Sequence, residues 1–258
     1  MNRIINTLDK IAAEGRKFLI AYLTGGVPDI NGTIEYFRAI EEGGADIIEI
    51  GIPFSDALAD GPVNQKAALE AIKNGIGIND MFNLMSGIRS FSETPVIFLV
   101  YYNTVFHYGP GRFVADCLKY GVDGLVIPDL PLEERQELQS FMDKAGLCLI
   151  PLVAPNSGER IKTVTNGCSG FVYCVSSMGV TGERKNFRKD INGYIQNVRM
   201  NCKLPAAVGF GISDSSTAGV FYDIADGIIV GSAIVRRILK GCSQSEITEF
   251  ISELVYKR

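Results

Sequence analysis

Two carboxylates eleven positions apart are the residues of this chain best placed for proton-transfer chemistry. Glu49 lies in an apolar run, and Ile48 and Ile50 point to the opposite face of the expected strand. Burial in such surroundings disfavours the charged carboxylate and raises its pKa. Asp60 follows in a loop-like stretch, so the two acids form a candidate acid/base pair.

The same strand allows a second interpretation, in which Glu49 is a structural carboxylate whose oxygens accept hydrogen bonds from backbone N–H groups. Buried ionisable groups are tolerated mostly where proton transfer is useful, which favours the catalytic interpretation. The only histidine, His107, lies in a loop rich in tyrosine and glycine and is expected at the surface. A Ser-His-Asp triad would have to include this residue, and no His-rich metal site is expected.

Three glycine-bearing segments form a candidate phosphate site. They are 179–182, 209–213 and the pair Gly231-Ser232, which opens an expected helix. Glycine lets backbone N–H groups approach a phosphate closely, and a helix N-terminus adds further donors. Because no lysine or arginine is part of these turns, backbone amides and the Ser232 hydroxyl would hold the anion.

Composition narrows the class of protein. The net charge is −4 without a block of like charges, which argues against nucleic acid or an anionic membrane as a partner. No apolar run approaches the roughly 18 residues that cross a bilayer. None of the six cysteines forms a Cys-x-x-Cys pair, so we expect a cytoplasmic protein with reduced cysteines.

Eight short apolar runs recur along the 258 residues, most of them followed by a helical pattern. The pattern predicts an α/β fold, a (β/α)8 TIM barrel in a single domain over 1–258. An extra N-terminal helix over 2–14 and extra helices in the loops, including 62–73 before 80–89, are also predicted. The expected strands are 18–23, 46–51, 96–101, 124–128, 148–152, 170–175, 206–209 and 227–230.

The chemistry is expected where the strands end, because reactive residues of such barrels gather at the C-terminal ends of the strands. The side chains there are mostly apolar and aromatic, which suits a flat hydrophobic group. No dinucleotide fingerprint or P-loop is present and no lysine stands at a strand end, which favours proton transfer without a cofactor. The expected neighbours of the two acids are Tyr22, Leu99, Tyr101, Ile127, Asp129, Ile150 and Tyr173.

Several motifs closely resemble the tryptophan synthase α subunit family, in the same order over essentially the whole chain. The Glu-x-Gly-x-Pro-Phe-Ser-Asp stretch is the most specific of them. The matching segments are AYLTGGVPD at 21–29, EIGIPFSD at 49–56, LADGP at 58–62, GLVIPDLP at 124–131, GVTG at 179–182, VGFGI at 208–212 and GS at 231–232.

The resemblance implies a carbon–carbon lyase of tryptophan biosynthesis that cleaves indole-3-glycerol phosphate to indole and glyceraldehyde 3-phosphate by a reversible retro-aldol reaction. Glu49 matches the general acid/base of the family, and Asp60 matches the acid that accepts a hydrogen bond from indole N1–H. The residues matching or near the indole pocket are Tyr22, Leu99, Ile127, Tyr173 and Thr181. Those matching the phosphate site are Gly182, Gly211, Gly231 and Ser232.

The resemblance also implies a partner. The family forms an α2β2 heterotetramer with a β subunit, which carries the pyridoxal phosphate, so no cofactor is expected in this chain. Segments 53–60 and 101–110 are expected at the β contact, and 176–188 as a lid over the site. Ala57 and Thr104 stand where the family usually has proline, and both fall in the segments expected at the β contact.

Three alternatives remain open from the sequence. The chain could be a stand-alone indole-3-glycerol-phosphate lyase that does not depend on a β subunit. It could be another phosphate-binding barrel enzyme, such as an isomerase of the histidine or tryptophan pathways, although such an enzyme would not explain the sequence of the 54–62 loop. A non-enzymatic regulator of the β subunit would need neither Glu49 nor Asp60.

Overall fold

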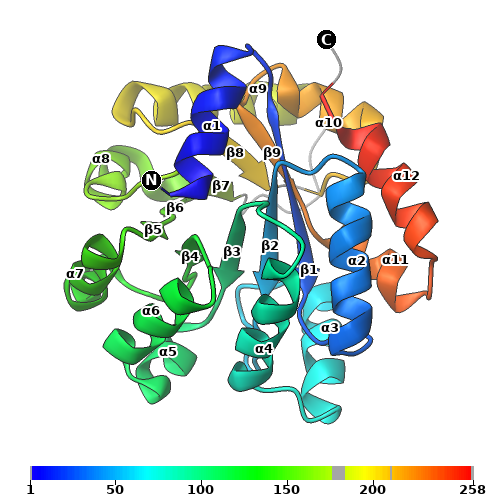
Figure 1. The fold of residues 1–258 in the computed structure, drawn as a ribbon. Helices are drawn as coiled ribbons and strands as arrows, with labels where there is room; N and C mark the ends of the chain where they lie inside the picture. The colour runs from blue at the N-terminus through cyan, green and yellow to red at the C-terminus, as the bar shows by residue number, and fades with distance from the viewer. Residues whose placement is uncertain (1, 176–183, 210, 257–258) are drawn as a thin grey trace.

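Nine parallel strands form one sheet in the computed structural model, counted over the residues that it describes, which are 2–175, 184–209 and 211–256. Their order in the sheet is β5-β4-β3-β2-β1-β9-β8-β7-β6 (Figure 1). The strands are β1 (Phe18–Thr24), β2 (Ile47–Gly51), β3 (Val96–Leu99), β4 (Gly124–Val126), β5 (Cys148–Leu149), β6 (Leu152–Val153), β7 (Val172–Val175), β8 (Ala206–Gly209) and β9 (Gly227–Val230).

The two end strands of this order, β5 and β6, are halves of one strand separated by two residues. The Ile150 N–H donates to Leu125 O on one side (2.9 Å), and Pro151 O accepts from the Tyr173 N–H on the other (2.9 Å). Proline has no N–H to offer the ladder, which explains the interruption. The sheet therefore closes into a ring of eight strands, and the predicted TIM-barrel fold is confirmed.

Helices surround this ring on its outside, as Figure 1 shows. Within the described ranges they are α1 (Arg3–Ala13), α2 (Ile30–Glu42), α3 (Pro62–Lys73), α4 (Ile78–Arg89), α5 (Tyr102–Tyr108), α6 (Pro110–Lys119), α7 (Arg135–Ala145), α8 (Ile161–Thr165), α9 (Arg184–Asn201), α10 (Ser215–Tyr222), α11 (Ser232–Leu239) and α12 (Gln244–Leu254), with 3-10 turns η1 (Leu132–Glu134) and η2 (Pro155–Arg160). The predicted extra helices are present as α1, α3 and α4.

Helix α1 closes the N-terminal end of the barrel. Its apolar side chains Ile4, Leu8 and Ile11 are buried in the cluster that fills the ring. The Asn2 side chain caps the helix by accepting from the Ile4 N–H (2.9 Å), and its amide donates to Asp123 O (2.7 Å). This end of the molecule is thus sealed by side chains.

Three aspartates at the start of strands hold neighbouring strands in register. Each carboxylate accepts a hydrogen bond of 2.9 Å from a backbone N–H near the start of the adjacent strand, and each also pairs with an arginine. The pairs are Asp46 with Leu19, Asp123 with Val96 and Asp226 with Ala206. The acids that the sequence places before these strands therefore have a structural role at the N-terminal end of the barrel.

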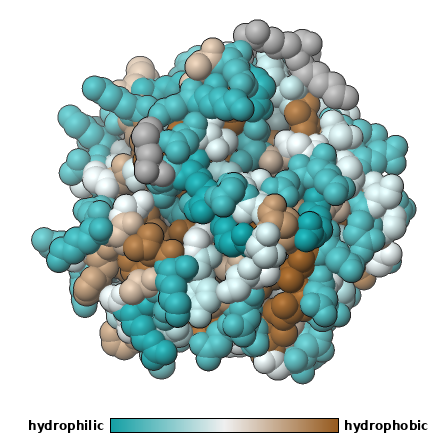
Figure 2. All heavy atoms as spheres, in the orientation of Figure 1, coloured by the Kyte–Doolittle hydropathy of each residue, from teal (hydrophilic) through white to brown (hydrophobic). Residues whose placement is uncertain are grey.

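The outer surface of the helices is mostly hydrophilic on the side seen in Figure 2, with apolar residues in patches between them. None of the described helices is long and apolar enough to cross a membrane. Two clusters of buried apolar side chains, one inside the ring and one between the ring and the helices, supply most of the free energy that favours folding.

Candidate active site

Glu49 lies in the middle of β2 and is buried inside the barrel. In register, it stands between Tyr22 of β1 and Ile97 of β3. Its side chain is 1% exposed, and neither carboxylate oxygen has a hydrogen-bond partner in the described part of the chain. Burial, and next the nearby charge of Asp60, raise the pKa of Glu49 to about 8. The interpretation of Glu49 as a carboxylate satisfied by backbone amides is therefore wrong.

Asp60 lies in the loop between β2 and α3 and has the partners that Glu49 lacks. The Tyr101 hydroxyl donates to Asp60 Oδ2 (3.1 Å) and accepts from the Ala59 N–H (3.0 Å). Asn64 makes a second side-chain hydrogen bond to the carboxylate. Burial raises the pKa of Asp60, and the hydrogen bonds from Tyr101 and Asn64 oppose that rise. Asp60 is thus biased towards the ionised form relative to Glu49.

The loop that carries Asp60 is held onto the end of β3. The Gln65 amide donates to Ala57 O (3.1 Å) and to Asp60 O (3.0 Å). The rings of Phe54 and Tyr101 stack with centroids 5.0 Å apart. Because α3 and β3 both contact the loop, the Asp60 carboxylate is fixed from two directions.

A cleft with two connected branches runs past Asp60, and Tyr22, which stands beside Glu49 in register, lines one of the branches. Both branches are lined by Asp60, Asn64, Leu99 and Tyr173. The first branch continues along apolar side chains, and the second leads to the glycine-bearing turns. The further lining residues of the first branch include Tyr101, Pro128, Leu152, Val153 and Val175, and those of the second include Tyr22, Gly211, Ile212, Gly231 and Ser232.

Glycines make room for the two tyrosines of the cleft. A Cβ on Gly51 would lie 2.1 Å from the Tyr22 hydroxyl oxygen, and a Cβ on Gly209 would lie 2.8 Å from Tyr173 Cε1. The Tyr22 hydroxyl lies 3.3 Å from Thr24 Oγ1, which gives it a buried partner. The position of each ring thus depends on a glycine in the neighbouring strand.

The second branch has the features expected of an anion site. Gly231 precedes α11, and its carbonyl accepts from the N–H groups of Ile234 (2.8 Å) and Val235 (3.0 Å). The amides of the first two helical residues precede these bonds and point out of the helix end. Gly211 has φ +46°, a left-handed conformation that favours glycine. Of the described residues, no lysine or arginine lines this branch.

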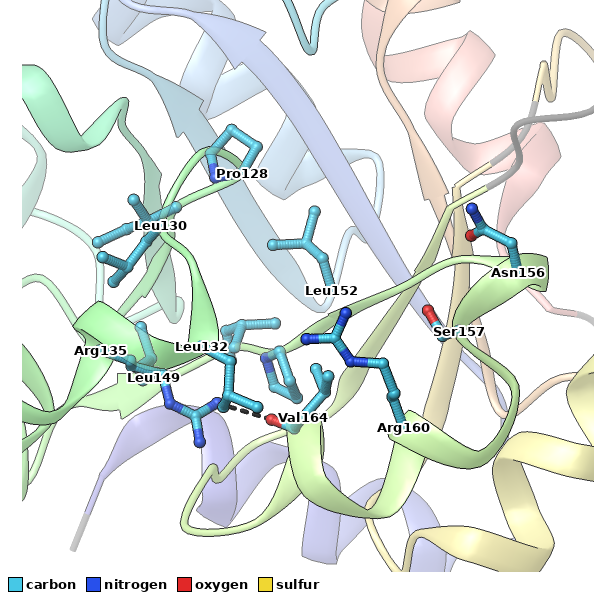
Figure 3. A pocket seen from close by; sticks show the side chains of 13 residues that line it. Pro128, Leu130, Leu132, Arg135, Leu149, Leu152, Asn156, Ser157, Arg160 and Val164 are labelled. Atoms are coloured by element: carbon cyan, nitrogen blue, oxygen red, sulfur yellow. Dashed lines mark hydrogen bonds between the residues drawn. The ribbon is translucent and has the colours of Figure 1, made fainter.

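Ile127 is the predicted indole-pocket residue that the structure does not bring to the cleft. Side chains alternate along a strand, and Val126 faces the inside of the ring, so Ile127 belongs to the outer cluster. Pro128 takes the next inward position and lines the first branch instead. Ile127 lines a neighbouring cavity, shown in Figure 3, which shares Pro128, Leu152 and Ser157 with the cleft.

The remaining predicted residues lie either away from the cleft or outside the described residues. Ile150 is buried in the cluster inside the ring, and Asp129 accepts from the Tyr102 N–H (2.8 Å) at the start of α5. Thr181 and Gly182 lie outside the described residues, as does most of the predicted lid at 176–188. Within 2–175, 184–209 and 211–256, no group of three or more His, Cys, Asp or Glu side chains is arranged to hold a metal ion.

Sequence reasoning missed several residues of the cleft, among them Asn64 and Pro128. Asn64 lies in the first turn of the predicted helix at 62–73, and its closeness to Asp60 in the sequence is the signal that could have indicated a contact. Thr104 also has a specific role, because its N–H donates to Tyr101 O (3.0 Å), a bond that proline could not make.

The sequence of the chain was compared with those of known protein families and curated proteins. A profile of the family described as "Tryptophan synthase alpha chain" matches residues 8–256. The chain is 49% identical over 255 residues to a protein of that name from Thermoanaerobacter pseudethanolicus, covering 99% of this chain and 97% of the relative.

Solved structures give the same result. The chain superposes on the tryptophan synthase subunit alpha from Legionella pneumophila with a TM-score of 0.91, at 32% identity, over 98% of this chain and 97% of that one. It superposes on a chain of the aminoacrylate-bound tryptophan synthase from M. tuberculosis with a TM-score of 0.88, at 30% identity, over 98% of both chains. Sequence and fold thus agree over nearly the whole chain.

Proposed function

The chain belongs to the tryptophan synthase alpha chain family, and on this premise we propose that it cleaves indole-3-glycerol phosphate to indole and glyceraldehyde 3-phosphate. The reaction is a reversible retro-aldol cleavage, catalysed by a lyase of tryptophan biosynthesis. One observation carries the proposal. Glu49 is a buried carboxylate without a partner among the described residues, and it feels the charge of Asp60, which lines a cleft with an apolar branch and a glycine-lined branch.

Glu49 is proposed as the general acid/base. A pKa of about 8 keeps it protonated near neutral pH and still able to give up the proton. It delivers a proton to C3 of the indole ring and accepts the proton of the hydroxyl on the adjoining glycerol carbon. As that hydroxyl becomes the aldehyde, the bond to indole C3 breaks and its electron pair returns to the ring.

Asp60 is proposed to accept a hydrogen bond from indole N1–H. When C3 is protonated, positive charge spreads over the ring towards N1, and a nearby carboxylate stabilises it. The hydrogen bonds from Tyr101 and Asn64 favour the ionised form that this role requires. The two acids thus have opposite tasks, in line with their different surroundings.

The two branches are proposed to hold the two ends of the substrate. The indole ring fits the first, more apolar branch next to Leu99 and Tyr173, and Tyr22 lines the second branch. The phosphate fits the branch at Gly211, Gly231 and Ser232, where amide donors replace basic side chains. Thr181 and Gly182 stay proposed members of these two ends.

A β subunit is proposed as the partner, in an α2β2 assembly whose pyridoxal phosphate belongs to β. In support, Leu58 and Phe106 are apolar side chains with exposed fractions of 81% and 65%, and both lie in the segments expected at the contact. We further propose that residues 1–258 act as one domain and that the protein works in the cytoplasm.

Indole release from indole-3-glycerol phosphate, measured with and without a β subunit, tests the proposal. Slow cleavage that rises on adding β is the expected result. Fast cleavage that ignores β would instead identify a stand-alone lyase. No cleavage in either condition would refute the proposed reaction.

A further inference from the structure

The side chain of Asn64 has one end, its carbonyl oxygen, to which the proposed reaction gives no role. Asn64 lies in the first turn of α3 and lines both branches, as Asp60 does. Its side-chain oxygen, Oδ1, is shielded from solvent and has no hydrogen-bond partner among the described residues. Of the buried side-chain oxygens without partners in that part of the chain, only Asn64 Oδ1 belongs to a residue that lines the cleft.

The other end of the same side chain is occupied. Asn64 is hydrogen-bonded to the Asp60 carboxylate, and since an ionised carboxylate only accepts, the amide Nδ2 must donate. This bond fixes the orientation of the amide, so the oxygen that lacks a partner is Oδ1. A buried acceptor that is left unmatched in the free protein is stabilised when a ligand supplies a donor.

We propose that Asn64 is a two-sided residue of the site, which holds the Asp60 carboxylate through Nδ2 and accepts a hydrogen bond from a glycerol hydroxyl of the substrate at Oδ1. The inference rests on the proposed function, because that reaction supplies the hydroxyls. The glycerol chain joins the indole ring to the phosphate and must therefore cross the junction of the two branches, where Asn64 lies.

The charges around Asp60 show why its ionised form depends on the hydrogen bond that Asn64 donates. The titratable groups that act on Asp60 or are acted on by it are Glu49 of β2, Tyr22 of β1, Tyr173 of β7 and Tyr101 after β3. All are acidic or neutral, and no cation pairs with Asp60 in the described ranges. The ionised carboxylate is therefore stabilised by hydrogen bonds, and loss of one of them is not compensated by a neighbouring charge.

Carboxyl 13C NMR of the ligand-free protein tests the Nδ2 side. We compare the titration of Asp60 in wild type, Asn64→Leu and Asn64→Asp, with Asn74→Leu as the matched control, because Asn74 is the C-cap of α3 and its side-chain amide donates to Pro28 O in an exposed position. The Asp60 pKa should rise by about one unit in Asn64→Leu and further in Asn64→Asp, where a second carboxylate adjoins it. An unchanged Asp60 pKa in both Asn64 variants would overturn this half of the proposal.

Ligand binding tests the Oδ1 side. In the Glu49→Gln background, where cleavage is blocked, we measure Kd for indole-3-glycerol phosphate and for indole-3-propyl phosphate, which has the same ring and phosphate but no hydroxyls. Asn64→Leu should weaken the first by roughly tenfold and the second by less than about twofold, as expected for one lost hydrogen bond. Equal weakening of both ligands would mean that Asn64 only packs against the substrate.

If Asn64→Leu does not fold, the isosteric Asn64→Asp, which lacks the Nδ2 donor, serves for the NMR comparison, and Asn64→Ala, which lacks the acceptor, serves for the binding comparison. Failure of this inference and failure of the proposed function look different. If wild type and Asn74→Leu release indole while both Asn64 readouts stay unchanged, the inference alone is wrong. If neither releases indole, the proposed reaction is wrong, whereas the NMR comparison still decides the contact to Asp60.

Discussion

Glu49 and Asp123 are equally buried carboxylates at opposite ends of the barrel, with exposed fractions of 1% and 3%. Asp123 accepts from the Val96 N–H (2.9 Å), from Arg89 (2.9 Å) and from Arg3 (3.0 Å). Glu49 has none of these partners in the described part of the chain. Burial alone therefore does not tell a structural acid from a reactive one; the partners do.

The partners also determine how far the pKa of each acid is raised. Burial raises the pKa of Asp123, but the Val96 N–H, Arg89 and Arg3 all oppose the rise. For Glu49 burial and the charge of Asp60 act in the same direction, towards a pKa of about 8. The N-terminal end of the barrel thus uses a buried charge to hold strands, and the C-terminal end keeps a buried proton available for transfer.

The largest effect is expected from Glu49→Gln, which keeps the shape and removes the transferable proton. Cleavage of indole-3-glycerol phosphate should fall by roughly 10²- to 10⁴-fold or more, since that is the usual contribution of a general acid/base. Stopped assays of indole release measure it, with circular dichroism as the check on folding. If the variant retains more than about a tenth of the activity, Glu49 is not the general acid/base, and the proposed difference between Glu49 and Asp123 is wrong.

Asp123→Ala tests the other end of the comparison. It leaves the half-buried Arg89 without its carboxylate and should lower the free energy of unfolding by about 3 to 5 kcal/mol. Urea denaturation measures the loss, and activity per folded molecule should stay within about twofold of wild type. Asp226→Ala is the matched control at a more exposed pair, Arg199 with Asp226, and should lose less.

The pH dependence of stability separates the two acids further. The folded-state pKa of Glu49 lies above its ordinary value of 4.5, so its favourable contribution is complete below that value and is lost as the pH rises through about 8. Wild type should therefore lose up to about 3 kcal/mol relative to Glu49→Gln between about pH 5.5 and pH 8. Parallel denaturation curves at several pH values measure it, and a flat difference would contradict the raised pKa.

Tyr101→Phe should give the smallest effect and refine the comparison at Asp60. It removes one hydrogen bond to the carboxylate and leaves the ring stacked on Phe54. Stability should change by about 1 kcal/mol and kcat should fall severalfold, because the pKa of Asp60 rises. Phe54→Leu is the matched change to the other ring of the stack and should leave that pKa in place. An unaltered kcat in Tyr101→Phe would mean that the hydroxyl serves only the loop.

Much of this arrangement was predictable from the sequence, and the exceptions have physical reasons. The eight strands were predictable from the apolar runs. The two acids were predictable because Glu49 is a charged residue within such a run and Asp60 follows it in the next loop. The pairing of Asp123 with Arg89 joins positions that only the fold brings together. The outward direction of Ile127 was not predictable, because a strand that is apolar on both faces carries no signal of which residue points inward.

The break between Ile150 and Pro151 divides the chain into two pieces of continuous sheet. Strands β1 to β5 fall in the first piece and β6 to β9 in the second, and apart from this break they meet where β1 pairs with β9. The two proposed acids lie in the first piece, and the described residues proposed to hold phosphate lie in the second. Fragments cut at this bond would each lack half of the chemistry, so restored indole release would report their reassembly.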